Sequence, residues 1–317
     1  MAEKEPAEEK AEPTRSGQRA AYTDELKYSL TLLLKNKLVL GGIVMSIFFI
    51  VIAALATVLV NPASAYKFNL AISYCWSNPF FTWSAQSATC PSNVSFPLGS
   101  DGYGRDLVSM IILAIPLDLS IALEVVATAL VIGIVLGAVA GFLGGWIDEA
   151  ILRITDIFFA FPFLILALVF AAILGRTIPN LEIAVILVWW PVYVRLIRGQ
   201  ILSEKNKQYV EALRALGVSR VRTLFVHLIP NAIYPVLVQA TLDVGGVILT
   251  FSALMFLGFS PSPALPELGN LAADGIEQIF TAPWLLVFPG VVILLISLGF
   301  NLVGDGLRDV LDPRLRR

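Results

Sequence analysis

The chain has 317 residues, of which 57% are hydrophobic and 15% are charged, and its mean hydropathy is +0.80. Soluble domains are about 45–50% apolar, so this composition excludes an ordinary soluble protein and indicates one that crosses a membrane several times. The formal charge of −2 gives no sign of a nucleic-acid partner.

Six apolar stretches come close to the ~20 residues that a helix needs to cross the hydrocarbon of a bilayer. They predict an all-α membrane protein with six transmembrane helices. The predicted spans are residues 38–60, 117–141, 157–174, 181–199, 231–258 and 284–303. An even number of spans places both termini on the same side of the membrane.

The basic residues predict which side that is. If both termini are cytoplasmic, 19 of the 22 Lys and Arg residues lie on the cytoplasmic side, and only Lys67, Arg105 and Arg176 lie outside. This asymmetry follows the positive-inside rule. We therefore expect a multi-pass protein of the plasma or inner membrane with cytoplasmic N- and C-termini.

The region before the first span divides into two parts. Residues 1–21 are rich in Glu, Lys, Ala and Pro, so they predict a disordered cytoplasmic tail. Residues 22–60 are predicted to hold an interfacial amphipathic helix followed by the first span. The alternative is that residues 22–37 only extend that span as a helix.

The predicted loop at 61–113 is extracytoplasmic and contains both cysteines of the chain, Cys75 and Cys90. Outside the cytoplasm a disulfide persists, so we expect these two to pair, with two free thiols as the alternative. Asn93 begins the only N-x-S/T sequon and is a possible glycosylation site.

A glycine-rich run, FPLGSDGYGRD at 96–106, precedes the second span. It predicts a turn that enters a helix, with Ser100 or Asp101 as the cap. A phosphate-binding loop would end in Gly-Lys-Ser/Thr, and the dipeptide Gly-Lys occurs nowhere in the chain. We therefore expect a transport subunit that does not itself hydrolyse ATP.

Residues 204–230 form a charged stretch between two apolar spans. Val210, Leu213 and Leu216 recur at helical spacing, and Gly217 stands where a left-handed cap would end the helix. The stretch predicts a short amphipathic helix at the membrane surface that contacts a partner. The alternative is a solvated loop.

Three of the acidic residues inside predicted spans are singled out, because a charge there is costly unless it is paired or faces water. Asp118 is expected near the outer interface, and Glu124 and Asp243 deeper. They are candidates for the translocation pathway, with structural pairing as the alternative. The chain has a single histidine, His227, so we expect no metal site.

Five ordered blocks resemble the second permease subunit of the dipeptide/oligopeptide (nickel) ABC importers, which are binding-protein-dependent transport systems. The blocks are PLGSDGYGRD, GGWIDEAILRITDIFFAFP, EALRALG, FLGFSPSP, and PWLLVFPG through FNLVGDGLRDVLDPR. The resemblance implies the type I importer fold, with a permease core at 114–304 and a cytoplasmic tail at 305–317. It also implies a homologous permease partner, two ATPase subunits that bind ATP and Mg, and an extracytoplasmic substrate-binding protein.

Within that resemblance, residues 208–217 correspond to the coupling helix that docks on an ATPase subunit. Its candidate coupling residues are Glu211, Ala212, Leu213, Arg214, Ala215 and Gly217. The implied substrates are di- and oligopeptides, with oligosaccharides or nickel as alternatives, and no cofactor is expected on this chain. An ion-coupled secondary transporter is the competing class, but it would need no such helix.

Overall fold

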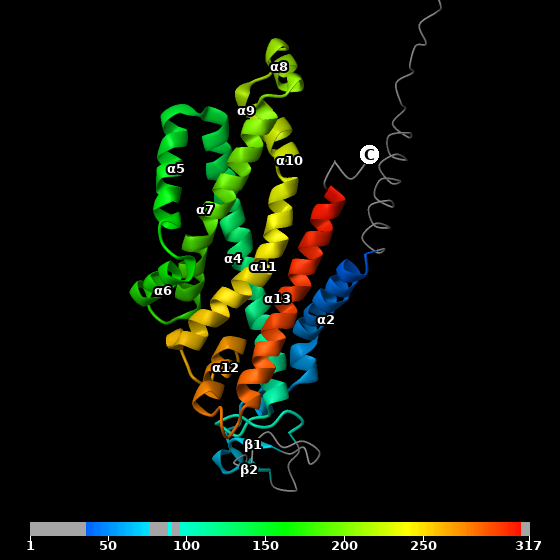
Figure 1. Ribbon diagram of the computed structural model, residues 1–317, viewed down its shortest axis with the longest axis vertical. Helices are drawn as coiled ribbons and strands as arrows, with labels where there is room; N and C mark the ends of the chain where they lie inside the picture. The colour runs from blue at the N-terminus through cyan, green and yellow to red at the C-terminus, as the bar shows by residue number, and fades with distance from the viewer. Residues whose placement is uncertain (1–35, 77–87, 91–95, 312–317) are drawn as a thin grey trace, which may run out of the picture.

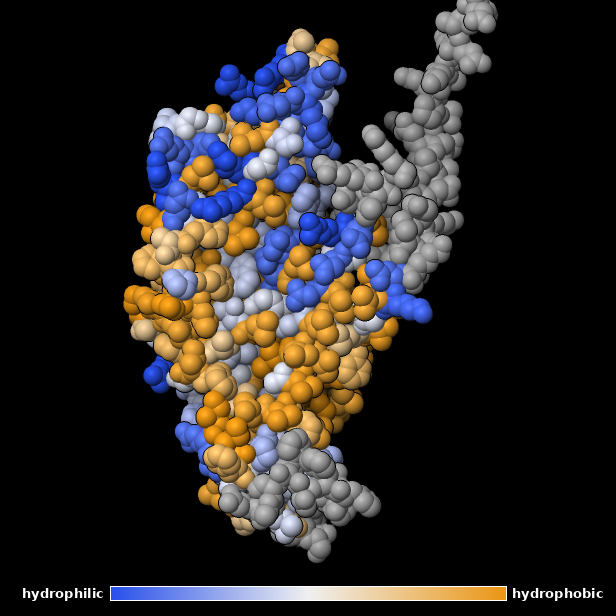
Figure 2. All heavy atoms as spheres, in the orientation of Figure 1, coloured by the Kyte–Doolittle hydropathy of each residue, from blue (hydrophilic) through white to orange (hydrophobic). Residues whose placement is uncertain are grey.

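The computed structural model describes residues 36–76, 88–90 and 96–311. They form an elongated helical bundle with α8 at one end and the short strands β1 and β2 at the other (Figure 1). The middle of the face in Figure 2 is largely hydrophobic, and hydrophilic residues gather toward the α8 end. The tail at 1–21, the interfacial segment at 22–35 and Asn93 lie outside the described residues.

Among the described residues, five helices are long and apolar enough to cross a membrane, and a sixth crossing is counted if the bent pair α5 and α6 forms one span. The protein is therefore a multi-pass membrane protein. The five are α2 (Lys37–Leu59), α4 (Leu107–Leu143), α7 (Ile178–Lys205), α11 (Tyr234–Leu254) and α13 (Trp284–Leu311). α13 continues past residue 303, the predicted end of the last span, to Leu311.

The span predicted at 157–174 does not form as one straight helix. The chain makes α5 (Gly145–Phe159) and α6 (Phe163–Leu174), which are bent by 91° relative to each other. Pro162 lies at the break with an extended ψ of 128°, and it has no N–H to continue the helical ladder. The residue before a proline is also driven out of the helical region, so the break follows from local sterics.

α4 and α7 form the central pair of the bundle. Gly133 and Gly137 of α4 let the helices approach closely, because a Cβ at Gly133 would lie 2.2 Å from the Cβ of Tyr193 on α7. α5 is held beside α7 by Asp148, whose carboxylate accepts two hydrogen bonds from Arg198, one of them 2.7 Å long. α13 packs against α11 and α2 on the other side.

The remaining elements are short. At the strand end they are α3 (Pro62–Ala65), η1 (Leu70–Ile72), and β1 (Cys75–Trp76), which pairs in parallel with β2 (Ala88–Thr89). α11 passes through the π-helical turn η3 (Met255–Phe259) and then α12 (Leu268–Glu277) before α13 begins. At the opposite end lie α8 (Gln208–Ala215), α9 (Arg220–Arg222), η2 (Thr223–Leu228) and α10 (Ile229–Ala232).

Candidate functional site: an exposed helix and its anchors

α8 projects from one end of the bundle (Figure 1). Val210 is fully buried at its base, whereas Glu211 and Arg214 are exposed on its outer turns and Leu216 is 79% exposed. Ala212 and Ala215 are also exposed, so small side chains give the helix a narrow outer surface. Of these two apolar residues, Val210 therefore anchors the helix in the bundle, and Leu216 is left exposed at its tip.

The end of α8 follows from its glycine. Gly217 has a φ of +72°, a conformation that only glycine adopts readily, and its N–H donates to the carbonyl oxygen of Arg214 at 3.0 Å. Leu213 is half-buried, and its carbonyl oxygen accepts from the N–H of Val218 at 3.0 Å. These contacts close the helix and turn the chain back toward the bundle.

The base of α8 is tied to the end of α7 by Glu204, a residue that is only 9% exposed as a whole. Its Oε1 lies 2.5 Å from Nζ of Lys207, and its Oε2 accepts from the hydroxyl of Tyr209 at 3.1 Å. Burial is the main factor that raises the pKa of Tyr209, and Glu204 raises it further. Two donors from the start of α8 thus converge on one acid of α7.

A second tie joins the end of α7 to the end of α4. Nζ of Lys205 donates to the carbonyl oxygen of Phe142 at 2.8 Å and lies 3.5 Å from that of Gly141. These carbonyls belong to the last turn of α4, where the helix dipole favours a cation. α8, α7 and α4 are therefore linked in series at this end of the bundle.

The three acidic residues predicted inside spans lie in different surroundings. Asp118 is 2% exposed, and its Oδ2 accepts from the N–H of Leu268 at 3.2 Å, while its carboxyl group also faces Glu267. Asp118 is thus fully buried against α12. Among the described residues, no hydrogen bond or ion pair joins any two of the three acids.

Glu124 is exposed on α4, and Glu182 of α7 lies within hydrogen-bonding reach of it. Asp243 on α11 is 9% exposed, accepts from Nε2 of Gln239 at 2.8 Å, and faces the hydroxyl of Tyr193. Glu124 is therefore the most accessible of the three, and Asp243 is held by neighbours inside the bundle.

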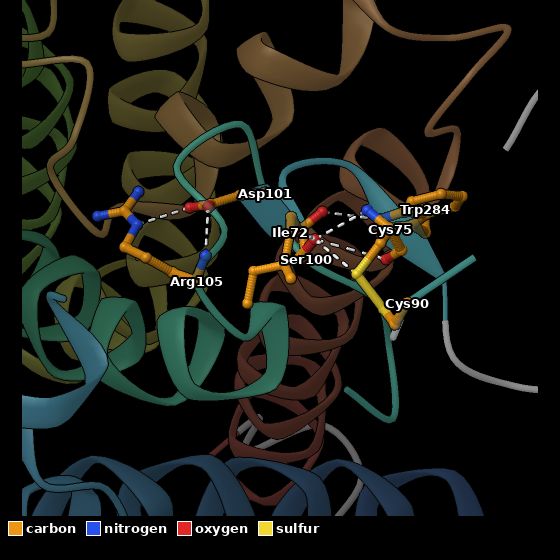
Figure 3. The surroundings of a disulfide bond; sticks show 7 residues. All are labelled: Ile72, Cys75, Cys90, Ser100, Asp101, Arg105 and Trp284. Carbon is orange, nitrogen blue, oxygen red and sulfur yellow. Dashed lines mark hydrogen bonds and ion pairs between the residues drawn. A yellow bond between two sulfur atoms is a disulfide. The ribbon is translucent and has the colours of Figure 1, made fainter. Parts of the chain in front are cut away.

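At the strand end, Cys75 and Cys90 are joined in a disulfide with an S–S distance of 2.07 Å (Figure 3). Ser100 is fully buried beside it, and its hydroxyl donates to the carbonyl oxygen of Ile72 at 2.6 Å and accepts from the N–H of Cys75 at 2.9 Å. Trp284, at the start of α13, donates through Nε1 to the carbonyl oxygen of Ser100 at 3.2 Å. The disulfide-bearing segment is thereby fixed to the last helix.

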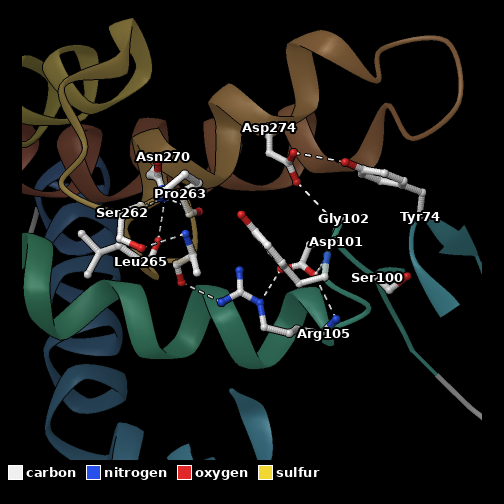
Figure 4. A network of polar contacts seen from close by, with 12 residues as sticks. Tyr74, Ser100, Asp101, Gly102, Arg105, Ser262, Pro263, Leu265, Asn270 and Asp274 are labelled. Atoms are coloured by element: carbon white, nitrogen blue, oxygen red, sulfur yellow. Dashed lines mark hydrogen bonds and ion pairs between the residues drawn. The ribbon is translucent and has the colours of Figure 1, made fainter. Parts of the chain in front are cut away.

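The glycine-rich run folds around a buried ion pair between Asp101 and Arg105, whose side chains are both 1% exposed (Figure 4). Arg105 also donates from Nη1 to the carbonyl oxygen of Ala264 at 2.7 Å. Asp274 of α12 accepts from the hydroxyl of Tyr74 at 3.3 Å, and burial together with this acid raises the pKa of Tyr74 to about 12. We call residues 61–76, 88–90, 96–106 and 260–283 the cap.

The predicted helix cap at Ser100 or Asp101 was wrong. Asp106 caps α4, and its Oδ2 accepts from the N–H of Ser109 at 3.0 Å. Asp101 instead folds the loop, because its Oδ1 accepts from the N–H groups of Tyr103 and Arg105, each at 2.9 Å. Within the described ranges, no group of three or more His, Cys, Asp and Glu residues could hold a metal ion.

The apolar bundle is consistent with a known family of membrane proteins. The family described as "Binding-protein-dependent transport system inner membrane component" matches residues 133–317, which is more than half of the chain. The chain belongs to this family.

Curated relatives of this inner membrane component extend the match toward the N-terminus. The dipeptide transport system permease protein DppC of Alkalihalophilus pseudofirmus is 38% identical over 89% of this chain and 88% of its own length. The protein of the same name from Escherichia coli K12 is 40% identical over 89% of this chain and 91% of its own length. The di/tripeptide transport system permease protein DppC of Pseudomonas aeruginosa is 40% identical over 70% of this chain and 73% of its own length.

Three acids of this inner membrane component have contacts in the structure that its sequence does not reveal. Glu204 belongs to the charged stretch but carries no sign of burial in its sequence. Glu182 lies beside Glu124, and Glu267 lies beside Asp118. Helical spacing could have placed Glu182 in the first turns of α7, but its partner on α4 follows only from how the two helices pack.

Proposed function

We propose that this chain is a permease subunit of an ATP-driven importer of short peptides. The observation that supports this best is α8, a narrow exposed helix that projects from a membrane-spanning bundle and is anchored at its base. The relatives that match the chain over most of its length carry names of dipeptide or di/tripeptide transport. Peptides are therefore the favoured substrate, ahead of oligosaccharides or nickel.

In the proposed orientation, the α8 end and both termini are cytoplasmic and the cap is extracytoplasmic. This places 19 of the 22 Lys and Arg residues in the cytoplasm, as the positive-inside rule favours. The disulfide then lies in an oxidising compartment, where it persists. A substrate-binding protein would dock on the cap, including its segment at 260–283.

The proposed assembly contains a homologous permease partner and two ATPase subunits that bind ATP and Mg. The tip of α8, residues 211–217, would insert into a groove on one ATPase subunit, so that closure of the ATPases displaces the helix. The small side chains of Ala212 and Ala215 suit a close fit, and Glu211 and Arg214 supply exposed charges of opposite sign.

Glu124 is the acid that we propose for the translocation pathway. It is exposed on α4 within a membrane-spanning helix, and a carboxylate there needs water or a partner subunit beside it. Glu182 adds a second acidic group at the same place. For Asp118 and Asp243 we propose structural pairing, because both are buried against groups of this chain.

The substrate is tested by uptake in the native host with and without this chain. Labelled dipeptides, short oligosaccharides and nickel would be compared, each with a parallel sample depleted of ATP. Loss of ATP-dependent dipeptide uptake alone supports the proposal. Loss of oligosaccharide or nickel uptake alone would replace the substrate, and uptake that survives ATP depletion would indicate ion coupling.

The role of α8 is tested by Glu211→Arg and Gly217→Asp. The first reverses an exposed charge, and the second places a side chain where φ is +72°. Both variants should reach the membrane in normal amounts and lose ATP-dependent uptake. Glu149→Arg reverses another exposed acid, on α5. It also breaks an exposed ion pair with Arg153, which contributes little to stability, so this control variant should transport normally. Normal uptake by both α8 variants would refute the assignment.

A further inference from the structure

The junction between α7 and α8 carries charges at the helix ends where they are electrostatically unfavourable. Glu204 lies in the last turn of α7, where the negative end of the helix dipole opposes an acid. Lys207 is the N-cap residue of α8, and its side chain makes no cap hydrogen bond. An ordinary junction would favour the reverse arrangement of signs.

The two charges contact each other, and this contact offsets their unfavourable positions at the helix ends. Nζ of Lys207 lies 2.5 Å from Oε1 of Glu204, and the hydroxyl of Tyr209 donates to Oε2 at 3.1 Å. Both donors lie on the α8 side of the junction and the acceptor lies on the α7 side. Only 11% of the Glu204 side chain is exposed, which shields these contacts from water.

The contacts at the base of α8 resist movement in two directions. Val210 is fully buried, so its packing resists a push of α8 into the bundle. Packing alone resists a pull weakly, whereas charge-assisted hydrogen bonds have to break when two elements separate. Lys205, next to Glu204, then connects α7 to the carbonyl oxygen of Phe142 at the end of α4.

We propose that Glu204, Tyr209 and Lys207 form a tether that makes α7 follow α8 when the ATPase subunits move it. Glu204 is a positioning residue in this scheme, because it acts through the two donors and touches neither substrate nor ATPase. The inference rests on the proposed function, and it adds the residues that convert displacement of α8 into movement of the spanning helices.

The test is Tyr209→Phe in the complete complex, reconstituted into proteoliposomes with its binding protein. The change keeps the aromatic ring and removes only the hydroxyl, which reaches Glu204 and also faces Asn231 of α10. ATP hydrolysis should continue, while peptide uptake per ATP hydrolysed falls by roughly tenfold, the effect of losing one hydrogen bond to a charged acceptor. Tyr234→Phe removes the hydroxyl of an exposed tyrosine on α11 and is the matched control.

A second variant and a double mutant separate the tether from general damage. Lys207→Met removes the other donor at a side chain that is 54% exposed, where the fold tolerates change. Glu204→Leu removes both acceptor oxygens, so combining it with Tyr209→Phe should lower uptake per ATP no further than Glu204→Leu alone. An additive loss would contradict the tether.

The outcomes for the tether and for the proposed function are distinguishable. If the unmodified complex moves no peptide at the expense of ATP, the proposed function fails. If the unmodified complex transports peptide and both Tyr209→Phe and Lys207→Met keep its ratio of uptake to hydrolysis, the function stands and the tether is overturned. A reduced ratio, with the ATPase subunits still retained in the purified complex, supports the tether.

Discussion

Replacing Gly137 by alanine tests whether the bundle depends on close contact between α4 and α7. A Cβ at this position would lie 2.1 Å from Cγ2 of Ile197 and 2.5 Å from the carbonyl oxygen of Val194. The isoleucine methyl can rotate away, but the backbone oxygen is fixed within α7. To bring the second distance to 3.0 Å, the two helices have to separate by about 0.5 Å, because interiors this dense have no free space.

Overpacking of this kind costs about 1–3 kcal/mol. Gly199→Ala is the matched control, because Gly199 lies inside α7 and a Cβ there meets no atom within 4 Å. At that site the higher helix propensity of alanine contributes about 1 kcal/mol in the favourable direction. The two substitutions are chemically identical, so their difference in stability isolates the contact between the helices.

The assay is thermal unfolding of the purified protein, followed by the fluorescence of its six tryptophans at one fixed scan rate. Unfolding of membrane proteins is often irreversible, so apparent unfolding temperatures are compared between variants at that rate. We expect Gly137→Ala to unfold about 2–6 °C below Gly199→Ala, at about 2 °C per kcal/mol for a chain of this size, because the gain in helix propensity is common to both variants. Gly199→Ala should unfold at the same temperature as the unmodified protein or higher. Equal unfolding temperatures for the two variants would refute the argument from packing.

Two further predictions concern the cap. Burial raises the pKa of Glu267 from its ordinary 4.5 to about 7, so between these pH values the folded protein binds more protons than the unfolded chain. The stability of the folded protein should therefore fall as pH rises from 4.5 to 7, by at most about 3 kcal/mol. The apparent unfolding temperature of Glu267→Gln should vary less over that range. An unfolding temperature of the unmodified protein that rises with pH over this range would contradict the prediction. The disulfide joins residues with a sequence separation of 15, and closing a loop of this length contributes about 3 kcal/mol to stability. The double variant Cys75→Ser with Cys90→Ser should therefore be more sensitive to limited proteolysis within residues 61–106, while the protein remains in the membrane. Unchanged cleavage would mean that the contacts of Ser100 and Trp284 suffice to hold the segment.

The parts of the fold that depend on local composition were predictable from the sequence. Long apolar runs locate α2, α4, α7, α11 and α13, because a bilayer requires both the length and the apolar character of such helices. The end of α8 at Gly217 is equally local, since the left-handed conformation there needs glycine. A proline inside a predicted span, such as Pro162, indicates a bend, but it does not predict a break of 91° or a start of α5 as early as Gly145.

The parts that depend on packing were not predictable. The burial of Asp118 is an example, because α12 returns against α4 and encloses this acid beside the N-terminus of a second helix. Glu204 and Tyr209 stand in a polar stretch where every charge suggests exposure, and only the fold shows that one of those charges is enclosed. Burial of a polar group is set by elements that are distant in sequence, so neither composition nor periodicity records it.

The contacts at the two ends of α4 suggest how the ends of the protein are connected. α4 has 37 residues and is about 55 Å long, so one helix runs from the cap to the base of α8. Near its start Asp118 binds the first turn of α12, and at its end the carbonyl oxygen of Phe142 accepts from Lys205 beside the tether. Between these points Gly133 and Gly137 hold it against α7 too closely for the two helices to slide independently. If α8 and the tether act as proposed, a displacement of α8 would reach α4 along its length, and through Asp118 it would reach the α12 side of the cap.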